Sequence, residues 1–199
     1  MKVIGITGGI GSGKSIVCEI LQNHYQAFLI NMDQIAHSFM EPGEISYELI
    51  VRHFGSNIID QEGKIDRKRL GEIVYQDEAE LKCLNSFTHP YVLSYVKNLI
   101  FEKSLSGEKL ICVESALPVE GKLSEICDEV WYVKASDAIR RERLETNRNY
   151  SKEKIDSIMS KQITEEKYKE IGSKIINNET SQDELIKQID NLLKLRDIK

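Results

Sequence analysis

The stretch Gly8–Ser15 (GGIGSGKS) combines the residue types that bind a chain of phosphates. A glycine, four intervening residues and then Gly13, Lys14 and Ser15 follow an apolar β-branched run and precede a helical pattern. Glycines let backbone amides curl around a β-phosphate, and the start of a helix adds the positive end of its dipole. A lysine at this position bridges the β- and γ-phosphates. We therefore predict that the loop binds a nucleoside triphosphate with magnesium.

The predicted nucleotide contacts extend over the whole loop and the first turn of its helix. Ser15 supplies the hydroxyl that binds Mg²⁺ in loops of this kind. A chance glycine turn before a helix is the alternative interpretation, and the complete match in the right context makes it the weaker one. The residues predicted to bind the nucleotide here are Gly9, Ile10, Gly11, Ser12, Gly13, Lys14, Ser15 and Ile16.

Two carboxylates follow predicted strands, where ligands collect in open α/β sheets. Asp33 comes after the strand 27–30 and could accept a proton from an attacking hydroxyl. The structural alternative is that Asp33 caps the helix that starts near Gln34, and both roles can hold. Glu114 ends the strand 109–113 and could contact Mg²⁺ through water, although a strand-end acid that caps the next turn is about as plausible.

Three arginines follow the fourth predicted strand, in the segment 135–154. Kinases commonly neutralise the moving phosphoryl group with arginines on a mobile lid that also excludes water. Arg140 and Arg143 share a helix face, and Arg148 lies on the turn beyond. Salt bridges to interleaved acids are the alternative for any single arginine, but for the cluster we favour a lid. The interleaved acids are Glu142, Glu145 and Glu153.

The elements that position these residues predict an α/β fold. Helical patterns separate five short strands, so crossovers of one hand and a parallel sheet follow. We expect a P-loop NTPase-type three-layer sandwich with a five-stranded parallel sheet and helices on both faces. The final helix carries an apolar stripe from Leu185 to Leu193 that would dock on this sheet. The predicted strands are Lys2–Thr7, Ala27–Ile30, Lys109–Val113, Glu129–Val133 and Lys174–Ile176.

The long stretch 33–108, between the second and third strands, has helical periodicity and few breakers. It is far longer than one crossover helix needs, so we predict one domain over residues 1–199 with a helical insertion at 33–108. The chain has 3 prolines, and we see no Gly/Ser-rich linker in it. We therefore expect the insertion to pack against the main body.

Composition excludes some partners. The formal net charge of −5 opposes the attraction to phosphate backbones on which nucleic-acid binding depends. The 4 cysteines show no CxxC spacing and lie in apolar surroundings, so we expect buried, reduced thiols. No apolar run is long enough to span a bilayer. We expect a cytoplasmic protein, free of nucleic acid and membrane, as a monomer or small homo-oligomer.

Seven motifs, spread over nearly the whole chain, resemble those of the dephospho-CoA kinase family. These enzymes phosphorylate the ribose 3′-hydroxyl of dephospho-CoA with ATP. The phosphate loop is shared by many families, whereas the motifs of the insertion are specific. The seven are ITGGIGSGKS, MDQIAHSFMEPG, HFG at 53–55, GKIDRKRLGEIVY, LNSFTHP, VESALPVE and IINNET.

The resemblance implies roles for residues of this sequence. Asp33 would be the general base, Lys14 and Arg143 would stabilise the moving phosphoryl group, and Arg67 and His89 would bind the acceptor. It also implies that 33–108 is the acceptor-binding region and that 140–168 is the lid, with Arg148 as a further nucleotide contact.

The sequence departs from the family pattern at several positions. Family members usually have an acid where Asn31 stands and an arginine where His37 stands. The proline of the VESALPVE motif is shifted to Pro118, while Glu120 keeps its place. The second lid arginine falls one residue late, at Arg148. These departures bear on which acid is catalytic and which arginine reaches the phosphates.

Two other functions fit part of the pattern. A nucleoside or nucleotide kinase shares the loop, sheet and lid, but the THP and EPG motifs speak against it. A GTP-dependent switch protein would use the loop without transferring phosphate, and Asp60–Gly63 (DQEG) fits a D-x-x-G pattern. We find no N-K-x-D guanine-binding motif, so we interpret DQEG as a turn.

Overall fold

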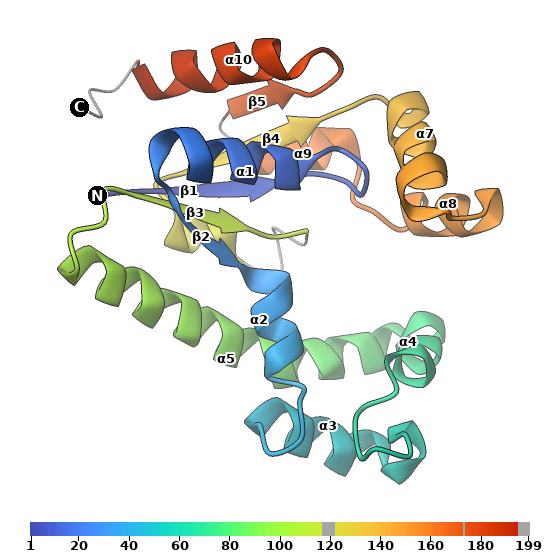
Figure 1. Cartoon of the computed structure of the whole chain (residues 1–199). Coiled ribbons are helices and arrows are strands. Elements are labelled where there is room, and N and C mark those ends of the chain that lie inside the picture. Colours follow the sequence, from blue (N-terminus) through green and yellow to red (C-terminus); the bar gives the residue numbers. More distant parts are fainter. Residues whose placement is uncertain (117–121, 173, 195–199) are drawn as a thin grey trace. The chain divides into compact units, whose positions relative to one another are not determined.

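The computed structural model describes residues 1–116, 122–172 and 174–194. The chain forms two compact units, one of Met1–Ile30 with Ser104–Lys199 and one of Asn31–Lys103 (Figure 1). Pro118 and Glu120, where the sequence rearranges a family motif, lie outside the described residues.

The first unit is built on a five-stranded sheet with the strand order β2-β3-β1-β4-β5 (Figure 1). β1 pairs with β3 and β4, and β4 pairs with β5, all in parallel. This confirms the predicted α/β fold with a parallel sheet. Each strand lies within one residue of its predicted bounds at either end. The strands are β1 (Lys2–Thr7), β2 (Phe28–Asn31), β3 (Leu110–Glu114), β4 (Glu129–Lys134) and β5 (Lys174–Asn177).

Two helices cover one face of the sheet, α1 (Lys14–Tyr25) and α10 (Gln182–Lys194). Side chains of alternate strand residues, such as Ile4 and Trp131, pack in one cluster with the apolar stripes of both helices. The stripe predicted for the last helix is present, because Leu185, Ile189 and Leu193 are buried there. Each such buried side chain stabilises the fold by about 1.5–3 kcal/mol.

The opposite face of the sheet is covered by α6 (Leu123–Ile126) and α9 (Glu165–Ile171). Gly5 alternates with the residues that face α1, and a Cβ there would lie 3.1 Å from Cys127 Sγ. The neighbouring α9 packs on β4 through Tyr132 and Tyr168, whose rings stack with centroids 5.0 Å apart. Helices on both faces complete the predicted three layers.

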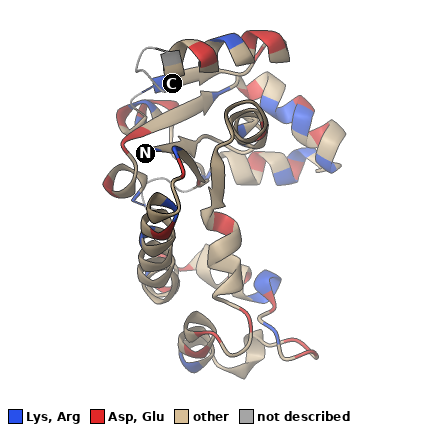
Figure 2. Cartoon of the chain, turned by 60° about the vertical axis from the view of Figure 1, so that its left-hand side comes forward, with Lys and Arg blue, Asp and Glu red and all other residues tan. Residues whose placement is uncertain are grey.

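Between β4 and α9 the chain forms α7 (Asp137–Arg148) and α8 (Lys152–Met159). Ser151 caps α8 with its hydroxyl, which accepts from the Lys154 amide. An ion pair between Arg141 and Asp156 joins the two helices. Figure 2 shows basic and acidic residues interspersed along the helices of the chain. Helix α7 thus carries the three arginines together with Glu142 and Glu145, whereas Glu153 lies on α8.

The second unit is helical. The apolar sides of its helices enclose a small core around Ile50, Ile58, Ile65 and Leu70. The helix α5 continues past Pro90, and the Thr88 hydroxyl donates to the Leu84 carbonyl, 3.1 Å away. Its elements are α2 (Met32–Ser38), α3 (Ile45–Phe54), the 3₁₀ turn η1 (Ser56–Ile58), α4 (Arg67–Gln76) and most of α5 (Glu78–Leu105).

The DQEG segment is a turn, as predicted. The Gly63 amide donates to the Asp60 carbonyl (3.2 Å), and Asp60 Oδ1 accepts from the amides of Glu62 and Lys64, both at 2.9 Å. Gly63 has φ +80°, which favours glycine. Local turn chemistry accounts for these residues, so the segment gives no support to a nucleotide switch.

The cysteines fit the prediction only in part. Cys18 and Cys112 are buried in the core, with their sulfurs 3.7 Å apart. Cys83 and Cys127 are partly exposed, so the expectation of burial is wrong for these two. For Cys83 the reason is its place on an outward-facing part of α5, next to the exposed Leu81 and Lys82. Among the described residues, no helix is both long and apolar enough to cross a membrane.

Candidate active site

The loop between β1 and α1 has the backbone of a phosphate-binding loop. Gly11 (φ +77°) and Gly13 (φ +90°) adopt left-handed conformations that favour glycine. Gly13 is the N-cap of α1 and has no side chain with which to cap the helix. The first amides of α1 are therefore placed to donate to an anion at the positive end of the helix dipole.

Two buried hydroxyl groups lie at this loop. Among the described residues, Thr7 Oγ1 and Ser12 Oγ are buried without a hydrogen-bond partner. Buried polar atoms in native proteins nearly always have a partner, so such atoms call for a ligand or water. Thr7 directly precedes the loop and Ser12 lies within it, so both hydroxyls are placed near where an oxygen-rich ligand would bind.

Lys14 Nζ folds back over the loop. It donates to the Gly8 carbonyl at 2.9 Å and lies 3.5 Å from the Gly9 carbonyl. The ammonium group is thus held directly over the curl of the backbone, where a phosphate chain would bind. Ser15 follows on the first turn of α1 and is exposed, so its hydroxyl is accessible to a cation.

Arg143 of α7 holds the second half of the loop by its carbonyl groups. Its Nη1 donates to the carbonyls of Gly11 and Ser12, both at 3.3 Å, and its Nη2 donates to the Asn178 carbonyl at 2.8 Å. The guanidinium group therefore lies against the phosphate loop, and it brings a fixed positive charge there.

Asn178 connects the end of β5 with the same part of the loop. Its buried side-chain amide donates to the Ser12 carbonyl at 2.8 Å, and its backbone amide donates to Lys134 at 2.8 Å. A Cβ on Gly13 would lie 2.0 Å from Asn178 Nδ2, so only glycine fits beside this amide. Asn178 and Gly13 are complementary, and together they fix where α1 begins.

Arg140 and Gln162 hold the first half of the loop. Arg140 Nε donates to the Ile10 carbonyl at 2.9 Å, and the Ile10 amide donates to Gln162 Oε1 at 3.1 Å. The Arg140 guanidinium also donates to Gln162 Oε1 and to Asp137 Oδ1. A Cβ on Gly9 would lie 2.5 Å from Arg140 Nη2, so a larger residue there would displace the guanidinium group.

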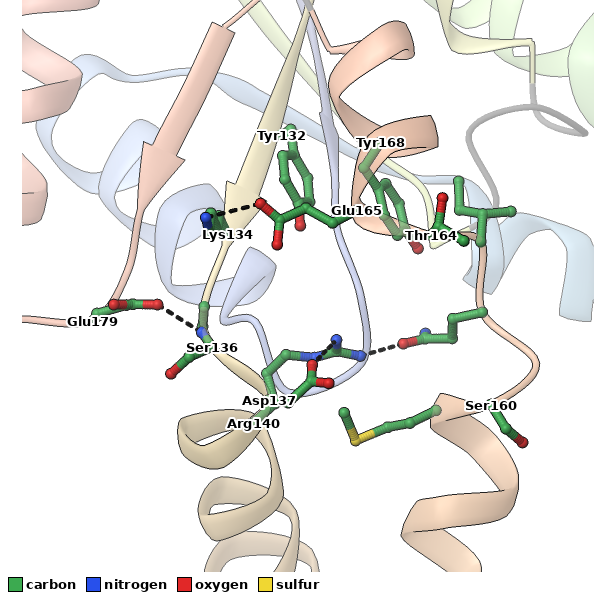
Figure 3. Close-up of a pocket in the computed structure, with 14 residues that line it drawn as sticks. Tyr132, Lys134, Ser136, Asp137, Arg140, Ser160, Thr164, Glu165, Tyr168 and Glu179 are labelled. Atoms are coloured by element: carbon green, nitrogen blue, oxygen red, sulfur yellow. Dashed lines mark hydrogen bonds and ion pairs between the residues drawn. The ribbon is translucent and has the colours of Figure 1, made fainter.

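A cavity of about 540 Å³ borders this contact on the side of α8 and α9 (Figure 3). Its wall includes the stacked Tyr132 and Tyr168, and Lys134 Nζ pairs there with Glu165 at 2.8 Å. Burial of the Tyr132 ring, and then the Glu165 charge, raise the pKa of its phenol. Glu179 accepts from the Ser136 amide on the far wall. The cavity is of a size that takes a small molecule.

Two further sequence candidates in this unit lie apart from these contacts. Arg148 is exposed at the last residue of α7, five residues beyond the partly buried Arg143. Glu114 ends β3, partly buried, and is aligned with Ile6 of β1. The structure thus brings Arg140 and Arg143 to the loop, whereas the roles of Arg148 and Glu114 stay predictions.

In the helical unit, the structure shows which residue caps α2. The helix starts at Met32, and Asn31 is its N-cap, with Oδ1 accepting from the Gln34 amide at 2.9 Å. Asp33 lies in the first turn and is not the cap, so the structural alternative for Asp33 is wrong. Asn31 thus supplies the capping oxygen of α2 with a side-chain amide.

Asp33 and Arg67 both act on His37. Partial burial and then the Arg67 guanidinium lower the pKa of the His37 imidazole, while the Asp33 carboxylate opposes them. Arg67 begins α4 and lies 3.9 Å from Glu41, with about half of each side chain exposed. His89 follows the buried Thr88 on α5 and is itself partly buried. Asp33 and Arg67 thus belong to one electrostatic group, centred on His37.

Sequence reasoning missed two residues that hold the loop. Asn178 stands in the IINNET motif. The resemblance included this segment but implied no role for the residue. Gln162 had no signal of its own, because a glutamine in a polar segment has many possible partners. Contacts across 152 and 166 residues of sequence bring these two side chains to the loop.

A glycine loop after a central parallel strand, with a lysine folded over it and arginines against it, defines a P-loop kinase fold. A model of the dephospho-CoA kinase family matches residues 2–184. The dephospho-CoA kinase of Carboxydothermus hydrogenoformans is 36% identical over 194 residues, which are 97% of this chain and 93% of that protein. The chain belongs to the dephospho-CoA kinase family, which transfers phosphate from ATP.

Solved structures agree. TT1252 from Thermus thermophilus superposes with a TM-score of 0.82 at 26% identity, covering 98% of this chain and 97% of its own. The dephospho-CoA kinase from Campylobacter jejuni superposes with a TM-score of 0.69 at 25% identity, covering 96% of this chain and 95% of that one. The resemblance predicted from the motifs is confirmed.

Proposed function

We propose that this chain transfers the γ-phosphoryl group of ATP to the ribose 3′-hydroxyl of dephospho-CoA, giving CoA and ADP. One observation carries the nucleotide half of the proposal. The loop that would bind the phosphates is fixed by Arg143 and Asn178 on one side and by Arg140 and Gln162 on the other. Family membership supports the acceptor.

The loop residues Gly9 to Ile16 would surround the triphosphate. Lys14 Nζ would leave the Gly8 carbonyl and bridge the β- and γ-phosphates, and Arg143 would neutralise the charge that develops on the moving group. Bound Mg²⁺ supplies charge neutralisation at the phosphates, and the exposed Ser15 hydroxyl is the residue here that would hold it. We assign Arg148 a contact to the nucleotide once the lid segment 140–168 is closed.

The acceptor would bind in the helical region 33–108, with Arg67 and His89 as contacts. Asp33 would hold the 3′-hydroxyl and take its proton as the oxygen bonds to the γ-phosphorus and the bond to the β–γ bridging oxygen breaks. Since Asn31 has no carboxylate, Asp33 is the acid at this position that can act as base. We place the enzyme in the cytoplasm, as a monomer or small homo-oligomer, without nucleic acid or membrane.

A competition assay tests this function. The chain is given MgATP with equal amounts of dephospho-CoA, adenosine and nucleoside monophosphates, and the products are identified by mass. We expect CoA as the phosphorylated product. Phosphorylation of a nucleoside or nucleotide in its place, or ATP hydrolysis with no phosphorylated acceptor, would overturn the acceptor assignment and leave the loop assignment standing.

A further inference from the structure

A histidine, a carboxylate and a thiol meet in the helical unit. His53 Nε2 lies 2.7 Å from Glu80 Oε2, and one ligand atom each of His53, Glu80 and Cys83 lie within 4.8 Å of one another. His53 and Glu80 are about one third exposed, and Cys83 is partly exposed. All three ligand atoms are therefore within reach of a cation from solvent.

The two helices that carry the cluster fix its side chains from both ends. His53 lies in the last turn of α3, and its ring packs edge-on against Phe54 and Phe87, with centroids 4.7 and 5.4 Å away. Glu80 and Cys83 are three residues apart on α5 and share one face. Asp77 accepts from the Glu80 amide, which holds the first turn of α5 in place.

The ion pair between His53 and Glu80 does not by itself explain why the three side chains lie together. An exposed pair of this kind contributes little to stability, and it leaves the nearby thiol unexplained. Imidazole nitrogen, thiolate sulfur and carboxylate oxygen are together the ligands that Zn²⁺ takes, at about 2.0–2.3 Å. Bonds of that length need ligand atoms roughly 3–4 Å apart, so small side-chain rotations would admit the ion.

We propose that His53, Glu80 and Cys83 bind one Zn²⁺, with water as the fourth ligand. The ion replaces the hydrogen bond between His53 and Glu80 and fastens the end of α3 to the start of α5. The apolar rings of Phe54 and Phe87 pack against the imidazole, and an apolar shell of this kind limits solvent access to a metal site. The site stabilises the helical unit, and it does not depend on the function proposed above.

Zinc titration of the full chain tests the site. The protein is stripped with a chelator and titrated with ZnCl₂ in excess Mg²⁺, against a chromophoric competitor. We expect one zinc per chain and a higher melting temperature with zinc than without it. Cys83→Ser should weaken binding by more than about 100-fold, and Glu80→Gln by about tenfold. Cys127→Ser and His24→Gln remove the same residue types outside the cluster and should change neither the stoichiometry nor the affinity.

The absence of stoichiometric binding, or binding that survives Cys83→Ser, would overturn the site. Zinc-edge X-ray absorption of the unsubstituted chain tests the ligands directly and does not depend on whether the variants fold. We expect one sulfur at about 2.3 Å and lighter ligands at about 2.0–2.2 Å. A shell of nitrogen and oxygen alone would contradict the proposal.

Discussion

The phosphate loop and the group around His37 are held in different ways. The loop receives hydrogen bonds at its carbonyls from Arg140, Arg143 and Asn178, which come from elements distant in sequence. Around His37 the interactions are between charges on half-exposed side chains, such as Arg67 and Glu41, 3.9 Å apart. Fixed backbone contacts resist solvent and salt, whereas exposed charge pairs are screened.

The difference has a chemical consequence. A loop that is already shaped for phosphates loses little free energy in reorganisation when the charge moves. The proposed acceptor residues, by contrast, would gain much of their order from the acceptor itself. We therefore expect substitutions at the loop to affect turnover most, and substitutions around His37 to affect the acceptor KM or stability.

The largest effect is expected from the two residues with proposed chemical roles. Lys14→Ala should lower kcat by about 10³-fold and raise the KM for ATP, because the lysine contacts both phosphates. Asp33→Asn should lower kcat by about 10²–10⁴-fold, because it removes the base, and leave the KM for ATP within about twofold. Steady-state kinetics with both substrates varied separate the two patterns. Near-normal turnover in either variant would contradict the role proposed for that residue.

Next in size is the effect expected at Arg143. Arg143→Ala should lower kcat by about 10²–10³-fold, since a fixed charge beside the phosphoryl group is lost. Arg141→Ala, two residues away, loses an ion pair with Asp156 and should keep turnover within about threefold. Equal losses in both variants would show that α7 acts only as a scaffold.

A smaller effect is expected at Asn178. Asn178→Ala leaves the Ser12 carbonyl without this donor and should lower the free energy of unfolding by about 1–3 kcal/mol. Because the loop loses a fixed point, the KM for ATP should rise as well. The exposed neighbour in Asn177→Ala serves as the control. Urea unfolding and ATP kinetics measure both, and a loss of stability with an unchanged KM would separate Asn178 from nucleotide binding.

Around His37, Arg67→Ala should raise the KM for dephospho-CoA by about tenfold, with kcat and stability nearly unchanged. Its pair with Glu41 is exposed and contributes at most about 1 kcal/mol. Lys64→Ala removes another partner of Glu41, at 3.8 Å, and should leave the KM unchanged. A similar KM for dephospho-CoA in both variants would contradict the placement of Arg67 in the acceptor site.

The smallest effect is a dependence on pH. The folded protein lowers the pKa of His37 below its usual value of 6.5, so the unfolded chain binds this proton more readily. The contribution is present in full above pH 6.5 and is lost as the pH falls toward the lowered pKa. We expect His37→Gln to lose less stability than the unsubstituted chain between pH 7.5 and pH 5.5, by urea midpoints. Equal losses would contradict the assigned direction.

Local patterns predicted the fold well. The strands and the loop follow from β-branched runs, glycines and spacing, which depend on neighbours in sequence. The roles of Asn178 and Gln162 depend on tertiary contacts. The capping of α2 by Asn31 is local, since the Gln34 amide lies three residues on, but Asn31 and Asp33 are both good capping residues. A single sequence does not reveal which of several polar side chains meets a given backbone group, so these contacts were not predicted.

The most direct test of the proposed reaction locates the transferred phosphate. The chain is incubated with MgATP and dephospho-CoA, and the product is examined by mass and ³¹P NMR. The same assay is run with the analogue that lacks the ribose 3′-hydroxyl. We predict phosphate on the 3′-oxygen and no phosphorylated analogue. A phosphorylated analogue, or phosphate on another oxygen of dephospho-CoA, would contradict the assignment of this chain's reaction.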